Sequence, residues 1–246
     1  MPMGGIYGAR TLLCVKLDHV AELRQARSSD GFDPAVYAAT CDRKGCKGVS
    51  AHLGRDRRYM SVEDVHGIKD AIRGEFNLEI GLSDEMIGLA REVRPHIVTI
   101  VPEMKEETTP GGGFDVKTHL SGIRDAVRLL HDDGIQVSFL IDPDIEALEY
   151  SKECAADRVE ICMAGYCDAR RKDEIDKEIR KVCAAVNHAA GMRLRVTAGR
   201  KLDYTNIEPL LDAAGLTEVH IGRAIISRSV EVGLSRALDD MLEILE

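Results

Sequence analysis

Residues 134–165 read GIQVSFLIDPDIEALEYSKECAADRVEICMAG and contain two kinds of segment in turn. The runs 136–142 and 158–165 are short and rich in apolar and β-branched residues, which is typical of strands covered on both faces. Residues 144–156, between them, have a helical period. A strand, a helix and a second strand in this order predict two parallel strands joined by a crossover helix.

The same unit repeats along the chain. The expected strands are 12–20, 48–53, 76–81, 96–102, 136–142, 158–165, 193–199 and 218–223. The expected helices are 34–45, 61–74, 83–94, 118–133, 144–156, 169–190, 204–214 and 226–245. This alternation predicts a closed (β/α)₈ barrel that forms a single domain over residues 1–246. The alternative is a doubly wound open sheet, but LDHVAELRQAR, after the first strand, lacks the glycine fingerprint expected there.

Composition narrows the class of protein. Of the 246 residues, 44% are hydrophobic and 30% are charged, which is enough for a large core and a solvated surface. The net charge of −9 argues against a nucleic-acid partner. No apolar run approaches the ~20 residues of a membrane span, and the N-terminus shows no secretory leader. These features predict a cytoplasmic protein that binds neither nucleic acid nor membrane.

The seven cysteines show no C-x-x-C spacing. We interpret them as thiols in a reducing compartment, with a metal site as the alternative. No H-x-H pair occurs, and the D-x-D pair of Asp142 and Asp144 fits a turn and a helix cap, so neither a metal nor a cofactor is expected.

The active site of such a barrel lies at the C-terminal ends of the strands. Acidic residues and histidines expected there are Asp18, His19, His52, Glu79, Glu103, Asp142, Asp144 and Glu160. Cations gather at the same ends: Lys16, Arg27, Arg55, Arg57, Arg58, Arg200, Lys201 and Arg223. Such a cluster suits phosphorylated substrates, and the HIGRAII turn at Gly222 provides a phosphate cradle at a helix N-terminus.

Simpler explanations exist for several of these residues. Asp142 and Asp144 flank Pro143 and fit a turn and a helix cap, and lone histidines at strand ends are often structural. A histidine and a glutamate on neighbouring strands of an anion-binding cleft nevertheless indicate proton transfer on a carbonyl substrate. The long polar loop 102–116 is interpreted as a lid over the barrel mouth.

Six separated segments resemble the pyridoxine 5'-phosphate synthase family: LDHVAELRQAR, HLGRDRRY, NLEIGLSDEMI, IVPEMKEETTPGGGFDV, GIQVSFLIDPD and HIGRAIISRSV. The resemblance implies condensation of 1-deoxy-D-xylulose 5-phosphate with 3-amino-2-oxopropyl phosphate, without a metal, in a homo-octamer. It implies that Asp18, His19 and Thr109 contact the first substrate and that Arg27 serves the aminoketone phosphate. His52 and Glu79 match the two general bases, and Gly222 matches a glycine of the phosphate turn.

The chain departs from the family pattern at several of these positions. The family has asparagine at Lys16, arginine at Gly54 and histidine at Tyr59 and Arg223. It has a His-Gly pair, with histidine as the proton donor, at Arg200 and Lys201. Because Gly54 has no side chain with which to bind a phosphate, Arg55 is the candidate for that role. Arginine cannot replace the acid, because it keeps its proton near neutral pH.

Three functions remain open at this point. The first is a pyridoxine 5'-phosphate synthase with altered proton donation. The second is a paralogue that acts on a more acidic phosphorylated carbonyl compound, with Lys16 as a Schiff-base nucleophile. The third is a non-catalytic protein that binds a phosphorylated metabolite. An ion pair of Lys16 with Glu79 or Glu160 is the alternative to the nucleophile.

Overall fold

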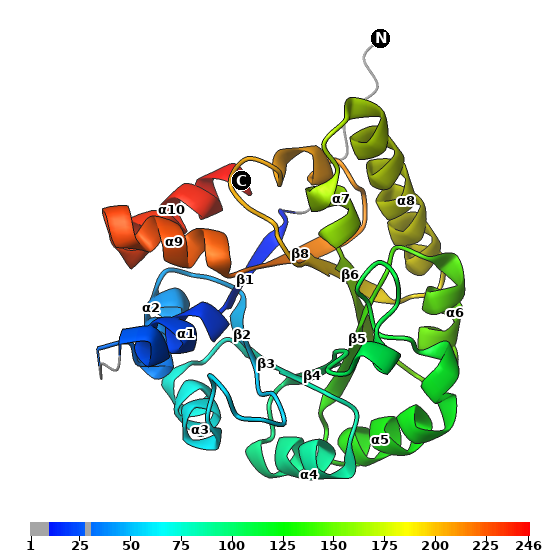
Figure 1. The fold of residues 1–246 in the computed structure, drawn as a ribbon, viewed down its shortest axis with the longest axis horizontal. Helices are drawn as coiled ribbons and strands as arrows, with labels where there is room; N and C mark the ends of the chain where they lie inside the picture. Colours follow the sequence, from blue (N-terminus) through cyan, green and yellow to red (C-terminus); the bar gives the residue numbers. More distant parts are fainter. Residues whose placement is uncertain (1–9, 28–30) are drawn as a thin grey trace.

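In a computed structural model, residues 10–27 and 31–246 are described; the segment 1–9, for which the sequence predicts no leader, lies outside them. Eight parallel strands close into a barrel in the order β1 to β8 (Figure 1). Their bounds are β1 Leu12–Lys16, β2 Gly48–His52, β3 Glu75–Ile80, β4 Ile97–Ile100, β5 Gln136–Ile141, β6 Arg158–Cys162, β7 Arg195–Gly199 and β8 Leu216–Ile221. The (β/α)₈ prediction is confirmed, and an open doubly wound sheet is excluded by the pairing of β1 with β8.

Helices surround the barrel (Figure 1). They are α1 Asp18–Arg27, α2 Pro34–Arg43, α3 Val62–Ala71, α4 Asp84–Val93, α5 Leu120–Asp132, α6 Ile145–Glu153, α7 Ala164–Asp168, α8 Lys172–Gly191, α9 Arg223–Val232 and α10 Leu234–Ile244. Three short 3₁₀ turns lie in the connections, η1 Lys105–Glu107, η2 Lys117–His119 and η3 Glu208–Leu210.

The first strand is shorter than the sequence predicts. It ends at Lys16, and α1 begins at Asp18, so Asp18 and His19 lie in the first turn of a helix. An acidic residue in the first turn is favourable because it faces the positive end of the helix dipole. The apolar run that suggested a longer strand continues into a segment whose charged residues recur at helical spacing, and the helix prevails there.

Two of the expected helices are also wrong in extent. The segment 204–214 forms only η3, because Pro209 lacks the N–H that a longer helix needs. The expected helix 169–190 is found as α8, and the short α7, which was not predicted, replaces the end of the expected strand 158–165. The expected helix 226–245 is divided at Gly233, whose φ of +81° is a conformation that glycine adopts without strain.

Alternation along the strands separates two environments. In β3, Phe76, Leu78 and Ile80 pack in the core between barrel and helices, while Asn77 and Glu79 belong to the opposite face and the barrel interior. Other buried interior positions are also small or polar: Ser50, Thr99, Ser138, Glu160, Thr197, Glu218 and His220. Interiors of such barrels usually hold branched aliphatic side chains. Buried polar groups need partners, so this interior must be internally paired.

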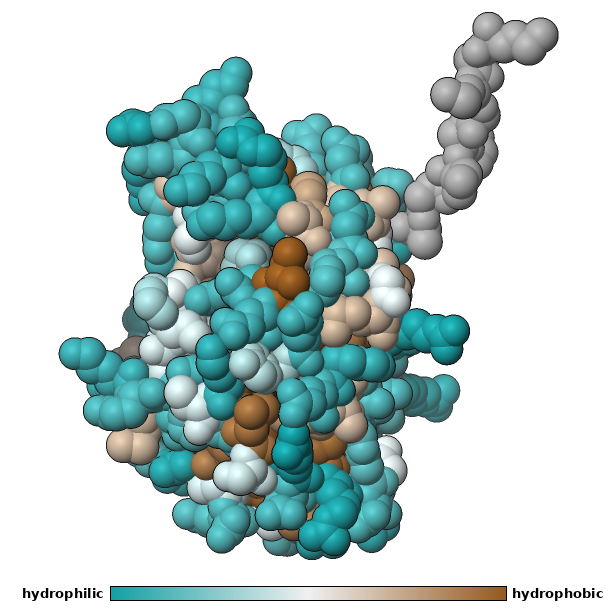
Figure 2. Space-filling view, turned by 90° about the vertical axis from the view of Figure 1, so that its right-hand side faces the viewer, coloured by the Kyte–Doolittle hydropathy of each residue, from teal (hydrophilic) through white to brown (hydrophobic). Residues whose placement is uncertain are grey.

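The outer surface is largely hydrophilic. On the face shown in Figure 2, hydrophilic side chains predominate and the hydrophobic patches are separate from one another. Within residues 10–27 and 31–246, every helix is too short or too polar to span a bilayer. All seven cysteines are free thiols.

Candidate active site

A hollow of about 490 Å³ lies at the C-terminal ends of β1, β2, β7 and β8. Of the candidate site residues that the sequence predicts, those that line it are Lys16, Asp18, His19, His52, Tyr59, Arg200, Lys201, Gly222 and Arg223. These residues come from chain positions 16 to 223 and meet at one mouth of the barrel. The convergence agrees with the rule that barrel sites form where the strands end.

Other predicted site residues do not line this hollow. Glu79 and Glu160 are buried, 3% and 2% exposed, in the barrel interior. Arg27 is exposed at the end of α1 and does not line the hollow. Arg55 donates to the Leu82 carbonyl at 3.1 Å and pairs with Glu103, so it is not free to hold a phosphate in this conformation. Thr109 also lies outside the hollow, because its position is set by the lid loop, residues 102–116.

The lid loop is tied to the end of β5. The Thr109 hydroxyl donates to Asp142 at 2.6 Å, and the backbone N–H groups of Gly111 and Gly113 donate to the same carboxylate at 3.1 and 3.0 Å. Thr109 therefore lines a second cavity, of about 430 Å³, beside the mouth. Asp144 caps α6 by accepting from Ala147 N–H at 3.1 Å, as the simpler explanation predicts.

Lys16, at the end of β1, forms an ion pair in the barrel interior with Glu79 of β3, across the intervening β2. Its Nζ lies 2.6 and 2.5 Å from the two carboxylate oxygens, and Asp18 lies 3.9 Å away. Burial alone would lower the pKa of Lys16, but the carboxylates of Glu79 and Asp18 raise it above the ordinary range. A lysine held as a cation is a poor nucleophile, so the geometry supports the ion-pair interpretation over the Schiff base.

Asp18 joins α1 to β2. Its Oδ1 accepts from the backbone N–H of His52 at 2.6 Å. Burial and the nearby Glu79 raise the pKa of Asp18, while Lys16 and the bond from His52 act in the opposite direction. His52 and Glu79 are register partners on β2 and β3, which confirms their placement on neighbouring strands.

The Arg200–Lys201 turn has a left-handed backbone, with φ of +72° and +61°. Such conformations cost non-glycine residues roughly 1–2 kcal/mol each. Lys201 pairs with Asp168 at 2.5 Å, whereas Arg200 forms no ion pair with a carboxylate of the described residues. Of the two adjacent cations, Lys201 is neutralised by Asp168, and Arg200 remains available to a ligand in the hollow.

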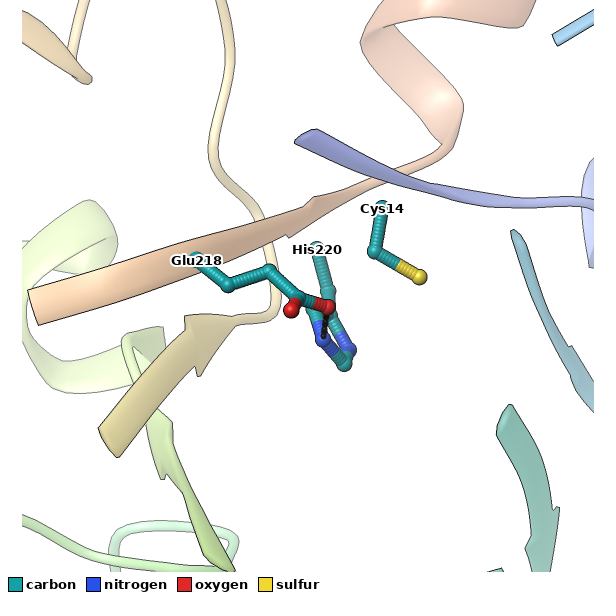
Figure 3. Close-up of side chains that lie close together, drawn as sticks. All are labelled: Cys14, Glu218 and His220. Carbon is teal, nitrogen blue, oxygen red and sulfur yellow. Dashed lines mark hydrogen bonds and ion pairs between the residues drawn. The ribbon is translucent and has the colours of Figure 1, made fainter. Parts of the chain in front are cut away.

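A buried ion cluster of Glu160, Glu218 and His220 occupies the barrel interior; the sequence analysis missed the last two, which Figure 3 shows beside Cys14. His220 Nδ1 lies 2.9 Å from Glu160, and its Nε2 lies 3.0 Å from Glu218. Cys14, Glu218 and His220 have the spacing of metal ligands, but the ion pairs already engage both ring nitrogens. Side chains alternate between the two faces of a strand, so counting back in steps of two from Gly222 would have placed His220 and Glu218 on the inner face.

A sequence model of the pyridoxal phosphate biosynthesis protein PdxJ matches residues 13–246. The chain belongs to the PdxJ family. It is 40% identical to the pyridoxine 5'-phosphate synthase of Syntrophotalea carbinolica over 234 residues, 95% of this chain and 98% of that one. It is also 40% identical to the pyridoxine 5'-phosphate synthase of Pseudoalteromonas translucida, over 95% of this chain and 96% of that one.

Solved structures show the fold alone. Phosphoribosyl anthranilate isomerase from Thermus thermophilus superimposes with a TM-score of 0.60 at 12% identity, covering 96% of this chain and 98% of that one. KGPDC from Streptococcus mutans superimposes with a TM-score of 0.58 at 13% identity, covering 96% of this chain and 99% of that one.

The cations at the strand ends therefore act unequally. Lys16 is neutralised by Glu79, and Lys201 by Asp168. Arg200 and Arg223 line the hollow without an ion pair to any carboxylate of the described residues. The positive charge that this PdxJ member offers to a ligand comes mainly from these two arginines.

We expect the buried cluster to make stability depend on pH. Burial by itself would lower the pKa of His220, but the carboxylates of Glu160 and Glu218 raise it to about 10. Because the folded pKa exceeds the unfolded value of about 6.5, the stabilisation is complete below pH ~6.5 and is lost as the pH rises through about 10. Urea unfolding of the wild type and His220→Asn should therefore differ most at pH 6 and converge at high pH. An equal difference at every pH would contradict the protonated histidine.

Proposed function

We propose that the protein is a pyridoxine 5'-phosphate synthase that condenses 1-deoxy-D-xylulose 5-phosphate with 3-amino-2-oxopropyl phosphate by acid–base catalysis. The observation that carries the proposal is the convergence of Asp18, His19, His52 and Gly222 in one hollow of a PdxJ-family barrel. These are the positions at which the chain resembles the family's substrate-binding and catalytic residues.

A phosphate group of the substrate fits the start of α9. Gly222 is the N-cap residue and Arg223 is the first helical residue, so backbone N–H groups and a guanidinium can converge on an anion there. A Cβ at position 222 would lie 2.7 Å from the Cβ of Lys16, which explains why glycine is required. Arg200 extends the cationic wall on the β7 side of the hollow.

Proton transfer is assigned to His52. Arg200 stands where the family keeps its acid, and a guanidinium does not release its proton near neutral pH. Glu79 has both oxygens within 2.6 Å of Lys16 Nζ. His52 has a ring edge that faces the hollow and can take a proton from the substrate and return it later.

The test is product formation by the purified protein supplied with both phosphates. Pyridoxine 5'-phosphate detected by mass spectrometry supports the proposal. Calorimetric binding of deoxyxylulose phosphate without product would indicate a binding protein, and absence of binding would indicate a different substrate. Arg200→His/Lys201→Gly is the matched variant: increased synthesis would show that the turn stands in place of an acid.

The surroundings of the enzyme are part of the same proposal. By resemblance, we infer a homo-oligomer, an octamer, that works in the cytoplasm on small phosphorylated substrates and without a cofactor. Light scattering after size-exclusion chromatography measures the oligomeric state directly.

A further inference from the structure

The ring of His52 faces a carboxylate at one nitrogen and is open at the other. Its side chain is 38% exposed and lines the hollow, while Nε2 is buried and lies 3.4 Å from Oε1 of Glu103, an ion-pair contact that is too long and poorly aligned to be a hydrogen bond in this conformation. Nδ1 forms no hydrogen bond with any of the described residues. A proton on Nε2, directed at Glu103, therefore leaves Nδ1 as the atom that can accept a proton.

Glu103 is itself fixed from several directions. Its side chain is only 9% exposed, just beyond β4. The backbone N–H of Arg55 donates to Oε1 at 3.2 Å, and the guanidinium Nε of the same residue lies 3.2 Å from Oε2. A Cβ at Gly81 would lie 2.4 Å from Oε2, so the loop after β3 leaves room for this carboxylate. The loops that follow three successive strands thus form a cradle for one side chain.

We propose that Glu103 is a positioning residue for His52: it selects the tautomer with hydrogen on Nε2 and presents Nδ1 to the substrate. The catalytic consequence rests on the proposed synthase function. The arrangement of Glu103 beside His52 does not rest on that function, because it is present in the protein without substrate.

Electrostatics point in the same direction. Burial by itself would lower the pKa of His52, but the adjacent carboxylate of Glu103 and the charges of Glu79 and Asp18 raise it, with Lys16 opposing them. Burial would raise the pKa of Glu103, but His52 and Arg55 lower it. A charged carboxylate beside the ring favours a histidine that keeps the proton it has taken and can give it back, which suits a site whose usual acid is replaced by Arg200.

The decisive experiment uses ¹⁵N-histidine NMR on the wild type, Glu103→Gln, Glu103→Asp and the control Glu106→Gln, an exposed glutamate of η1. In Glu103→Gln we expect His52 to titrate at lower pH and to lose its single tautomer. Glu103→Asp, which shortens the side chain but keeps the charge, should be intermediate. The control should match the wild type. An unchanged His52 tautomer and titration in Glu103→Gln would overturn the proposal.

Kinetics provide the second readout. Misplacing a catalytic group by about 1 Å can cost about 10²-fold, so Glu103→Gln should lower kcat by about that factor with little change in KM, and the limb of the pH profile set by His52 should move to lower pH. If Glu103 only joined Arg55 to the loop after β4, Glu103→Gln would change neither the His52 tautomer nor the pH profile. If the wild type makes no product while the NMR result holds, the proposed function fails and the positioning role stands.

Discussion

Replacing His52 with alanine is expected to lower kcat for pyridoxine 5'-phosphate formation by about 10²–10⁴-fold, the usual contribution of one general acid–base group. The effect should be large because His52 is asked to both remove and return a proton. The fold should persist, since the bond to Asp18 comes from the backbone N–H of residue 52, which alanine retains. Single-turnover assays at saturating substrate would measure the chemical step.

A matched control separates this effect from a general loss of histidine. His66 lies on α3 and does not line the hollow, so His66→Ala should keep wild-type kcat. Circular dichroism and urea unfolding should show that both variants fold. Retention of full activity by folded His52→Ala would remove this residue from the mechanism.

Lys16→Met is expected to lower the free energy of unfolding by about 3–5 kcal/mol at neutral pH, because it leaves the buried Glu79 carboxylate without its cation. The side chains of the pair are only 18% and 4% exposed. Adding Glu79→Gln to Lys16→Met should restore much of the loss, since the uncompensated charge is removed. Urea unfolding of the two single variants and the double variant completes the cycle.

An exposed pair provides the comparison. Lys117 and Glu146 lie 2.8 Å apart but are 56% and 59% exposed, so Lys117→Met should destabilise the protein much less than Lys16→Met does. If Lys16→Met destabilises no more than Lys117→Met, the interior pair is not the stabilising contact that its burial indicates.

Much of the fold was predictable because its signals are local. Short apolar runs alternating with helical segments occur within ~30-residue windows, and they placed all eight strands. The errors were few: α1 was not predicted and replaced the end of the first expected strand, Pro209 shortened a helix and Gly233 divided another. In each of these places the backbone preference of a few residues outweighed the hydrophobic pattern.

The site divides in the same way. Sequence alone placed His52, Arg200 and Gly222 at strand ends, and such residues must meet at one mouth because parallel strands in a barrel all end on the same side. It left open whether Lys16 was a nucleophile or an ion-pair partner, counted Arg55 as a phosphate contact and overlooked His220. The closed barrel decided the role of Lys16 by bringing Glu79, 63 residues away in the chain, to within 2.6 Å of its Nζ.

The face of a strand on which a side chain lies follows from the two-residue period of a strand, and it can be read from the sequence. Pairing across the barrel interior depends on register, closure and side-chain length, none of which is encoded near the residue itself. Sequence therefore determined the barrel, the mouth and the residue types gathered there. Tertiary structure determined which charges neutralise each other, Lys16 with Glu79 and His220 with Glu160, and which remain for a ligand, because low-dielectric burial forces every enclosed charge to find its partner across space.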